Sequence, residues 1–322
     1  MKMLQKKLAL LLSAFVVLAV IPFSVSASTS QPIWVGGIEM RAGEYLANGA
    51  IATTDKKPTG GYAYYKEGIL TLSNYEYKGS EKKSSATIFC AGDITVNLEG
   101  YNSIVFDGTN WENCAILSDG DLIVCGNGTI TINNFYMGLY SNNDVIINGG
   151  NIIIPSNSGI GIVAIGSIMF NSGNLNFGAS TIGLCSDDGD ITINSGNINI
   201  AASYYAIYTN NKLTINGGSL IAKSFNLEKD SKYCAINVGG IFTIGDDLFV
   251  KAAASPHDEL GEFLLIERRT YDYIVISDCD CNCHQNGISN FFFKIALFFQ
   301  KIFGLNTVCS CGLEHLIFNS NW

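Results

Sequence analysis

The segment GLCSDDGDITIN, residues 183–194, contains the pattern that decides the fold: an apolar anchor, a polar turn, an alternating strand and a terminal asparagine. Six further segments repeat this order of features along the chain. They are ATIFCAGDITVN (86–97), AILSDGDLIVC (115–125), GLYSNNDVIIN (138–148), GIVAIGSIMFN (161–171), AIYTNNKLTIN (206–216) and AINVGGIFTIG (235–245). Self-similarity of this kind predicts a solenoid in which each segment belongs to one coil.

The spacing of the anchors predicts the size of a coil. The anchors are Ile88, Ile116, Leu139, Ile162, Leu184, Ile207 and Ile236, and 28, 23, 23, 22, 23 and 29 residues separate them. A period of 22 or 23 residues suits three short strands and three turns. A leucine-rich horseshoe has a similar period, but the chain lacks its Leu-x-x-Leu-x-Leu signature. We therefore predict an all-β chain, a right-handed parallel β-helix of about seven coils.

Asparagines end the strand that follows each turn in most of the repeats. The positions are Asn97, Asn148, Asn171, Asn194 and Asn216, with Cys125 in the equivalent place of the second repeat. Stacked coils would bring these amides about 4.8 Å apart, close enough to bond their neighbours above and below. We predict an asparagine ladder with a structural role.

Four segments are expected along the chain. Residues 1–27 carry three lysines, an apolar run and a small-residue exit, which predicts a cleaved signal peptide and a secreted, extracellular or cell-surface protein. Residues 28–80 are expected to cap the solenoid, and residues 81–276 to form it. Residues 277–322 are expected to form a tail. The net charge of −9 and the presence of only three arginines argue against a nucleic-acid partner.

The tail is rich in cysteine, histidine and phenylalanine. Its candidate metal ligands are Cys279, Cys281, Cys283, His284, Cys309, Cys311 and His315. They suit a structural Zn²⁺ site, and disulfides are the alternative for an exported chain. Between them, residues 288–303 are expected to form a short Phe-rich helix, which is a candidate for contact with the cell envelope or with a protein partner.

Acidic residues recur at one turn of the repeat. Asp121, Asp144, Asp187, Asp188 and Asp190 are candidate calcium ligands, because carboxylates stacked on neighbouring coils supply the oxygen atoms that Ca²⁺ prefers. The alternative is that aspartate simply favours turns.

Aromatic residues on the coils form a candidate platform for sugar rings. The candidates are Trp111, Tyr136, Tyr140, Tyr205 and Tyr208, and Tyr140 and Tyr208 occupy the same place in their repeats. Packing against the core or the surface is the alternative role for each ring. Residues 86–250 contain no arginine and no histidine, so we expect no enzymatic activity by the routes that polysaccharide lyases and hydrolases use.

Four segments carry a resemblance to a known family: Trp34–Gly37, Gly68–Ser73, Ala91–Gly100 and Gly120–Val124. Across residues 31–276 the chain resembles secreted clostridial β-helix proteins that bind carbohydrate, and it is similar to their calcium-containing, pectin-binding members. The tail resembles a C-terminal module of other exported Firmicutes proteins. The resemblance implies a non-catalytic polysaccharide-binding protein with calcium as a possible cofactor. A structural or adhesive surface protein is the alternative, and a divergent lyase or hydrolase is a third.

Overall fold

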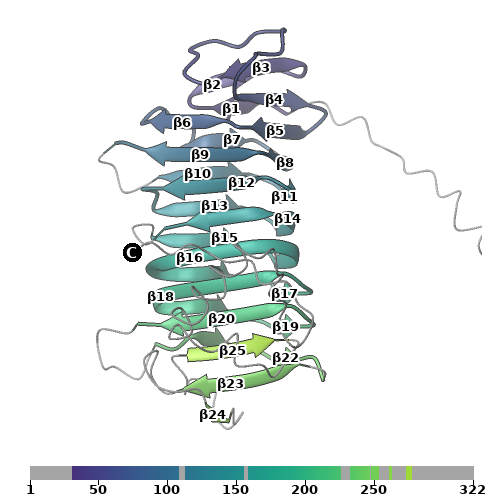
Figure 1. Ribbon diagram of the computed structural model, residues 1–322, viewed down its shortest axis with the longest axis vertical. Coiled ribbons are helices and arrows are strands. Elements are labelled where there is room, and N and C mark those ends of the chain that lie inside the picture. The colour runs from purple at the N-terminus through teal and green to yellow at the C-terminus, as the bar shows by residue number, and fades with distance from the viewer. Residues whose placement is uncertain are drawn as a thin grey trace, which may run out of the picture. The chain divides into compact units, whose positions relative to one another are not determined.

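The computed structural model describes residues 31–108, 113–155, 159–225, 233–246, 248–253, 261–262 and 273–277. All regular structure in these ranges is β, and the strands wind into a solenoid of about six turns (Figure 1). The all-β prediction is therefore confirmed for these residues, and the handedness of the coil stays a prediction. No helix long and apolar enough to span a membrane occurs in these ranges. The predicted signal peptide, the tail with its Phe-rich helix, and Trp111 lie outside the described residues.

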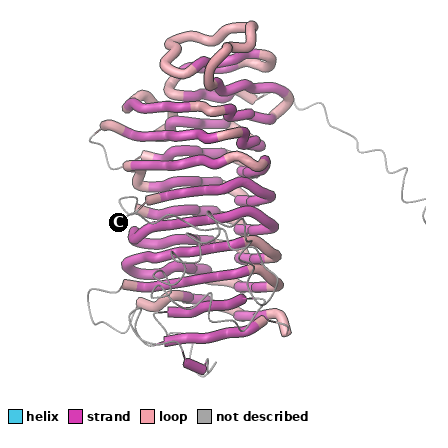
Figure 2. The backbone as a smooth tube through the Cα atoms, in the orientation of Figure 1, coloured by secondary structure: helices cyan, strands magenta, loops and turns pink. Residues whose placement is uncertain are grey.

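Each turn of the solenoid contributes strands to three faces, and the strands within each face pair in parallel. We call them face 1, face 2 and face 3. Face 1 consists of β7 (Ala86–Cys90), β10 (Cys114–Ser118), β13 (Met137–Ser141), β15 (Ile160–Ala164), the ends of β16 (Ile168–Ser186) and β18 (Asn197–Thr209), and β21 (Ile236–Val238). Face 2 consists of β5 (Ile69–Ser73), β8 (Ile94–Glu99), β11 (Leu122–Gly126), the starts of β14 (Val145–Ile154) and β16, then β17 (Ile191–Ile193), β19 (Leu213–Ile215) and β22 (Phe242–Ile244). Face 3 consists of β6 (Glu76–Gly79), β9 (Tyr101–Phe106), β12 (Thr129–Asn133), the end of β14, the middle of β16, the start of β18, and β20 (Ser219–Ser224). Figure 2 shows that strands fill most of each turn and that the loops lie at the corners.

The predicted repeat register is confirmed on face 1. Ile88 pairs with Ile116, Ile116 with Leu139, and the pairing continues from coil to coil as far as Ile207 with Ile236. The seven anchors therefore delimit six complete turns. The solenoid has about six turns, one fewer than the seven coils that the sequence predicted, because each anchor marks a boundary between turns.

Antiparallel strands close both ends of the ladder. At the N-terminal end, β1 (Ile33–Val35) pairs with β2 (Ile38–Met40) and with β7, and β3 (Glu44–Ala47) pairs with β4 (Tyr62–Lys66). At the other end, β25 (Tyr273–Ser277) pairs with β20 and with β23 (Phe249–Ala253), which also pairs with β24 (Gly261–Glu262). These pairings occupy strand edges that stacked coils would otherwise leave open to another chain.

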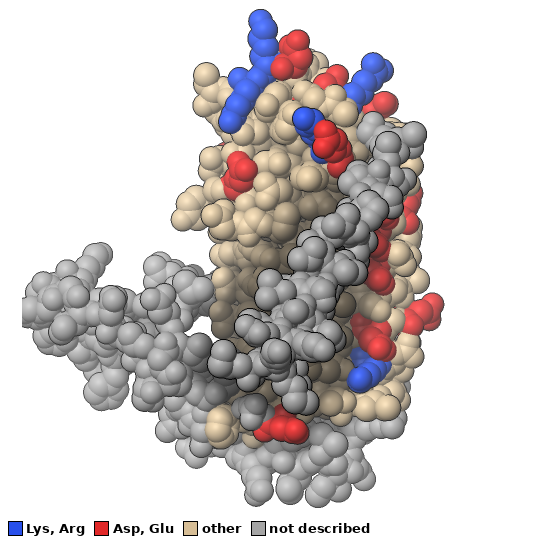
Figure 3. Space-filling model, turned by 90° about the vertical axis from the view of Figure 1, so that its right-hand side faces the viewer, with Lys and Arg blue, Asp and Glu red and all other residues tan. Residues whose placement is uncertain are grey.

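Charged side chains are unevenly distributed over the surface of the solenoid. On the face that Figure 3 shows, most of the visible Lys and Arg side chains lie at the end that carries the cap strands, and Asp and Glu side chains lie there and along one edge of the stack. The part of the coils that this view leaves uncovered is otherwise dominated by uncharged residues.

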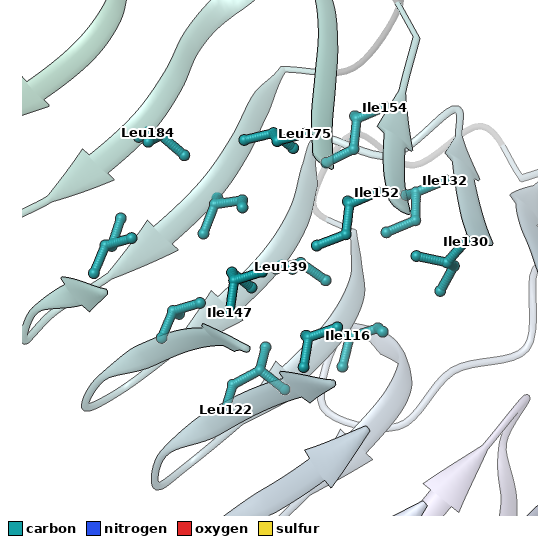
Figure 4. Close-up of a cluster of buried hydrophobic side chains, with 14 of the residues drawn as sticks. Ile116, Leu122, Ile130, Ile132, Leu139, Ile147, Ile152, Ile154, Leu175 and Leu184 are labelled. Atoms are coloured by element: carbon teal, nitrogen blue, oxygen red, sulfur yellow. The ribbon is translucent and has the colours of Figure 1, made fainter. Parts of the chain in front are cut away.

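The interior is a continuous apolar column that runs along the stack. Alternate residues of each strand point inward, so Ile116 and Leu139 of face 1 meet Ile147 of face 2 and Ile152 of face 3 (Figure 4). Burial of each such side chain contributes roughly 1.5–3 kcal/mol to folding. Every coil therefore depends on its neighbours for part of its stability.

A glycine permits the sharp corner between face 2 and face 3. Gly196 has a φ of 94°, a conformation that other residues rarely adopt. A Cβ atom added there would lie 2.5 Å from the carbonyl oxygen of Gly173, one coil earlier. The corner therefore needs glycine for its backbone conformation and also for the close stacking of the coils.

Candidate functional site

The turn between face 1 and face 2 contains the aspartates that the sequence singled out. The Oδ1 atom of Asp93 accepts the backbone N–H of Asp121 at 2.8 Å, and that of Asp121 accepts the backbone N–H of Asp144 at 3.2 Å. Asp144 accepts the backbone N–H of Ser167 at 2.7 Å. Each carboxylate thus satisfies a backbone donor of the next coil, which gives these aspartates a structural role in the turn.

Later in the stack the same line of bonds continues through a serine. The Ser167 hydroxyl accepts the backbone N–H of Asp190 at 3.2 Å, and Asp190 accepts that of Lys212 at 3.0 Å. Ser167 therefore keeps the line continuous where the sequence departs from aspartate. The neighbouring Asp187 and Asp188 use their backbone carbonyls, which accept the side-chain amides of Asn210 and Asn211.

Metal binding at this turn stays a prediction. Within the described ranges, no three His, Cys, Asp or Glu side chains come close enough together to hold one metal ion. The seven cysteines and histidines predicted as zinc ligands or disulfide partners lie outside those ranges.

A line of buried hydroxyls beneath the turn was not predicted. Ser118 donates to the carbonyl oxygen of Gly92 at 2.6 Å, and Ser141 donates to that of Gly120 at 2.6 Å. Ser186 and Thr209 make the equivalent bonds farther along the stack. Each hydroxyl ties its own coil to the turn of the preceding coil. The signal in the sequence is a small hydroxyl residue two positions after the anchor.

The outer surface of face 1 carries the tyrosines that were predicted to contact sugar rings. Tyr140 pairs with Val163, Val163 with Cys185, and Cys185 with Tyr208, so the two tyrosines stand in one column, three coils apart. The anchor before each of them points into the core, and the tyrosine rings therefore point outward. At the usual spacing of strands, their Cα atoms are separated by about 14 Å.

Aromatic rings cluster at the C-terminal end of face 1. Tyr204 stacks on Tyr233 of the next coil, with ring centroids 4.2 Å apart and planes inclined by 10°. Tyr205 contacts Tyr208 at 5.4 Å and Tyr233 at 5.5 Å. Three of the rings are half-buried, and Tyr204 is 39% exposed. Tyr205 and Tyr208 of this cluster were predicted from the sequence. Tyr233, which contacts both Tyr204 and Tyr205, was not predicted.

Tyr136 lies nearer the N-terminal end of the same face. It precedes Met137, whose successors in the pairing are Ile160, Ile182 and Tyr205, so Tyr136 occupies the place that Tyr204 takes three coils later. Its ring is 44% exposed. The pair Tyr136 and Met137 therefore occupies the same place in its coil as the pair Tyr204 and Tyr205 does three coils later.

Both column tyrosines are held by an asparagine two residues later. The Tyr140 hydroxyl donates to Oδ1 of Asn142 at 3.1 Å, and the Tyr208 hydroxyl donates to Oδ1 of Asn210 at 2.8 Å. The Asn142 amide in turn donates to Oδ1 of Asp119 at 2.9 Å. These bonds fix the direction of each ring and place amide groups beside it. We call Tyr136, Tyr140, Tyr204, Tyr205, Tyr208 and Tyr233 the tyrosine face.

The environment of the tyrosine face is acidic. Burial raises the pKa of Tyr140 above its ordinary value, and the negative charge of Asp187 raises it further. The Asp187 carboxylate also accepts a hydrogen bond of 3.6 Å from the Cys185 thiol, within the column itself. The Tyr140 hydroxyl therefore stays protonated at neutral pH and remains a donor.

A concave feature that was not predicted lies in the cap. It is a cavity of about 1070 Å³ between the cap loops and the first strands of face 3, and Tyr77, Glu76 and Lys78 are among its lining residues. It forms where Gly36 and Gly37 turn the chain between β1 and β2, outside the repeats. No repeated pattern in the sequence could have indicated it.

Comparisons with known proteins bear on the coils that carry the tyrosine face. Residues 80–238 match the model of a family described as carbohydrate-binding domain-containing protein. No curated protein matches the chain. The chain is similar to a solved "polysaccharide lyase-like protein from C. thermocellum", with 19% identity and a TM-score of 0.36, over 62% of this chain and 95% of that one. An identity and a TM-score this low carry no argument about activity.

Proposed function

We propose that this protein is a non-catalytic, extracellular polysaccharide-binding protein and that the tyrosine face is its binding surface. The proposal rests on one observation. The region that matches the carbohydrate-binding family, residues 80–238, is the region whose outer surface carries all six tyrosines.

The chemistry of the tyrosine face suits sugar rings. The C–H faces of a pyranose ring pack on the faces of aromatic rings, and Tyr also supplies a polar hydroxyl at its edge. The asparagines beside Tyr140 and Tyr208 hold those hydroxyls, which reduces the entropy that binding would otherwise cost. The second N–H of the Asn142 amide is left to donate to a sugar hydroxyl.

The order of the stack suits a long ligand. Tyr140 and Tyr208 are about 14 Å apart in one column, so a chain of sugars lying along the stack would meet one ring and then the other. Two weak contacts joined by one ligand give a stronger combined affinity than either gives alone. We therefore expect oligosaccharides too short to reach both rings to bind weakly.

The composition of the coils supports binding without catalysis. Residues 84–211 contain no Lys, Arg or His, so this stretch offers no basic side chain to abstract a proton from a sugar or to clamp an acidic one. The N-terminal lysines and apolar run support export, and carbohydrate of a cell wall or of the medium would then be within reach.

Affinity electrophoresis of the full mature chain through gels containing single polysaccharides tests the proposal. We expect retardation in at least one gel, with no new reducing ends and no unsaturated products in a parallel incubation. Product formation would replace the proposal with an enzymatic function. Free migration in every gel, together with binding to cell envelopes from which the glycan has been removed, would replace it with a structural or adhesive function.

A further inference from the structure

Residues 84–211, which form most of the coils, contribute negative charge and no positive charge of their own. Between Ser84 and Asn211 the sequence contains ten Asp and Glu residues and no Lys, Arg or His. Many of these acids fall in the turn between face 1 and face 2, and red side chains follow one edge of the stack in Figure 3. The charge therefore lies along the border of the tyrosine face.

Two carboxylates stand directly beside the tyrosine column. Asp119 is joined to Tyr140 through Asn142, by hydrogen bonds of 2.9 and 3.1 Å. Asp187 contacts Cys185, which lies between Tyr140 and Tyr208 in the column. A sugar that packs on Tyr140 would therefore lie near the Asp119 carboxylate, and a sugar chain that follows the column would pass Asp187.

Within the part of the chain that the structure describes, three lysines border or follow this acidic stretch. The Lys83 ammonium lies over the Trp34 ring, 5.1 Å from its centroid, at the N-terminal end of face 1. Lys212 follows Asn211 in the acidic turn, where its backbone bonds to Asp190. Lys223 lies over the Tyr273 ring, 4.2 Å from its centroid, on face 3. None of these contacts places an ammonium group beside Tyr140.

From this arrangement we infer that the tyrosine face selects polysaccharides without carboxylate or sulfate groups. The inference rests on the proposed function and names the class of its ligand. An acidic sugar on Tyr140 would be repelled by Asp119 and Asp187, and no lysine contact of the described residues places an ammonium group beside that ring to offset the repulsion. A repulsion between unit charges about 4 Å apart in water corresponds to about a fivefold loss of affinity, and partial burial increases it.

A pair of polysaccharides that differ only in charge tests the inference. The probes are polygalacturonate and the same polymer after chemical reduction of its carboxyl groups, beside a panel of uncharged polysaccharides that includes xyloglucan and glucomannan. Binding of the mature chain is measured in EDTA and in added CaCl₂, at low and high salt. We expect an uncharged polysaccharide to bind at least about tenfold more tightly than polygalacturonate, with little dependence on salt or EDTA.

Two variants of equal charge change sharpen the test. Asp119→Asn combined with Asp187→Asn removes the two carboxylates beside the column and preserves their hydrogen-bond acceptors. Glu99→Gln combined with Asp107→Asn removes two exposed charges elsewhere. We expect the first variant to raise the ratio of acidic to uncharged binding by about fivefold or more, and the second to leave that ratio unchanged.

The outcomes separate the inference from the proposed function. Tighter binding of polygalacturonate than of its reduced form, in EDTA or in CaCl₂, would overturn the inference and leave a polysaccharide-binding protein. Absence of binding to every probe would overturn both. An equal shift in the two charge variants would show that Asp119 and Asp187 do not select the ligand, which would also overturn the inference.

Discussion

The side-chain amide of Asn171 donates a hydrogen bond of 2.8 Å to the amide oxygen of Asn148, one coil earlier in the stack. Asn194 donates in the same way to Asn171, and Asn216 donates to Asn194, both at 2.7 Å. Four coils are thus joined by one line of side-chain amides outside the backbone ladder. The structure confirms the asparagine ladder, and the Cys125 thiol replaces an amide beside Asn97 at 3.8 Å.

Replacement of Asn171 by alanine removes two bonds of this ladder at once. We expect Asn171→Ala to lower the free energy of unfolding by about 1–2 kcal/mol, because each net bond contributes about 1 kcal/mol. Urea titration followed by circular dichroism measures the change. Thr192→Ala, on the same face, is the matched control and should cost less than about 0.5 kcal/mol. Equal losses in the two variants would show that the ladder adds no stability.

Asp144 offers a test of the structural role of the acidic turn. Asp144→Ala leaves the backbone N–H of Ser167 without its 2.7 Å acceptor, and we expect a loss of about 1–2 kcal/mol. Asp144→Asn keeps an acceptor oxygen and should lose less than half as much. Each variant is compared with the wild type in CaCl₂ and in EDTA. If both variants are less stable than the wild type only in CaCl₂, the carboxylate acts on a bound cation and not on the Ser167 amide.

Two glycines with similar backbone angles separate conformational strain from crowding. Gly43 has a φ of 92° and open space where a Cβ would lie, whereas Gly196 has a φ of 94° and meets Gly173 and Phe170. Gly43→Ala should cost about 1 kcal/mol, and Gly196→Ala roughly 1–3 kcal/mol more. Thermal unfolding of the two variants measures the difference. Equal costs would mean that the stacked coils relax freely around the added methyl group.

The buried thiols predict a pattern of chemical reactivity. Burial, and then the negative charge of Asp187, raises the pKa of Cys185 to about 12, and burial also raises the pKa of Cys114. A raised pKa lowers the thiolate fraction, so neither thiol should react with iodoacetamide at mildly alkaline pH in the native protein. Among the five cysteines of the described coils, peptide mapping should find alkylation at the half-buried Cys125 first. Rapid modification of Cys114 would contradict its place in the stack.

The same shift sets the pH dependence of stability. The pKa of Cys185 is higher in the folded state than its ordinary value of 9.0, so this thiol is protonated in both the folded and the unfolded chain at neutral pH. Above about pH 9 only the unfolded chain loses the proton, and stability falls as the pH rises towards 12. Cys185→Ala should reduce this alkaline loss in a pH series of urea titrations. An unchanged pH dependence would assign the loss to other groups.

The sequence predicted the features that repeat from coil to coil. The anchor register and the asparagine ladder followed from seven copies of one pattern, because residues at equal places in stacked coils must be neighbours. The hydrogen bonds from Tyr140 to Asn142 and from Tyr208 to Asn210 were missed, although both pairs stand two residues apart in the sequence. Such a bond needs both side chains on the outer side of a corner, and the pattern of apolar residues does not specify that geometry.

Non-repeating features were beyond the same argument. The cavity beside Tyr77 forms between cap segments that have no counterpart in the coils, so no second copy indicated which residues would meet.

The aspartates of the turn do repeat, but their repetition had two interpretations. Their repetition was consistent with calcium ligands and also with turn formation, and only the bonds to backbone amides, such as Asp144 to Ser167, revealed what the carboxylates do in the fold.

Isothermal titration calorimetry of three proteins with the polysaccharide that retards the wild type tests the central claim most directly. Tyr140→Ala combined with Tyr208→Ala removes both rings of the column, and Tyr101→Ala removes a tyrosine that is 79% exposed on face 3. We predict that the double variant binds about tenfold or more weakly than the wild type, while Tyr101→Ala binds within about twofold of it. Wild-type affinity in a correctly folded double variant would show that the glycan binds elsewhere and would contradict the account.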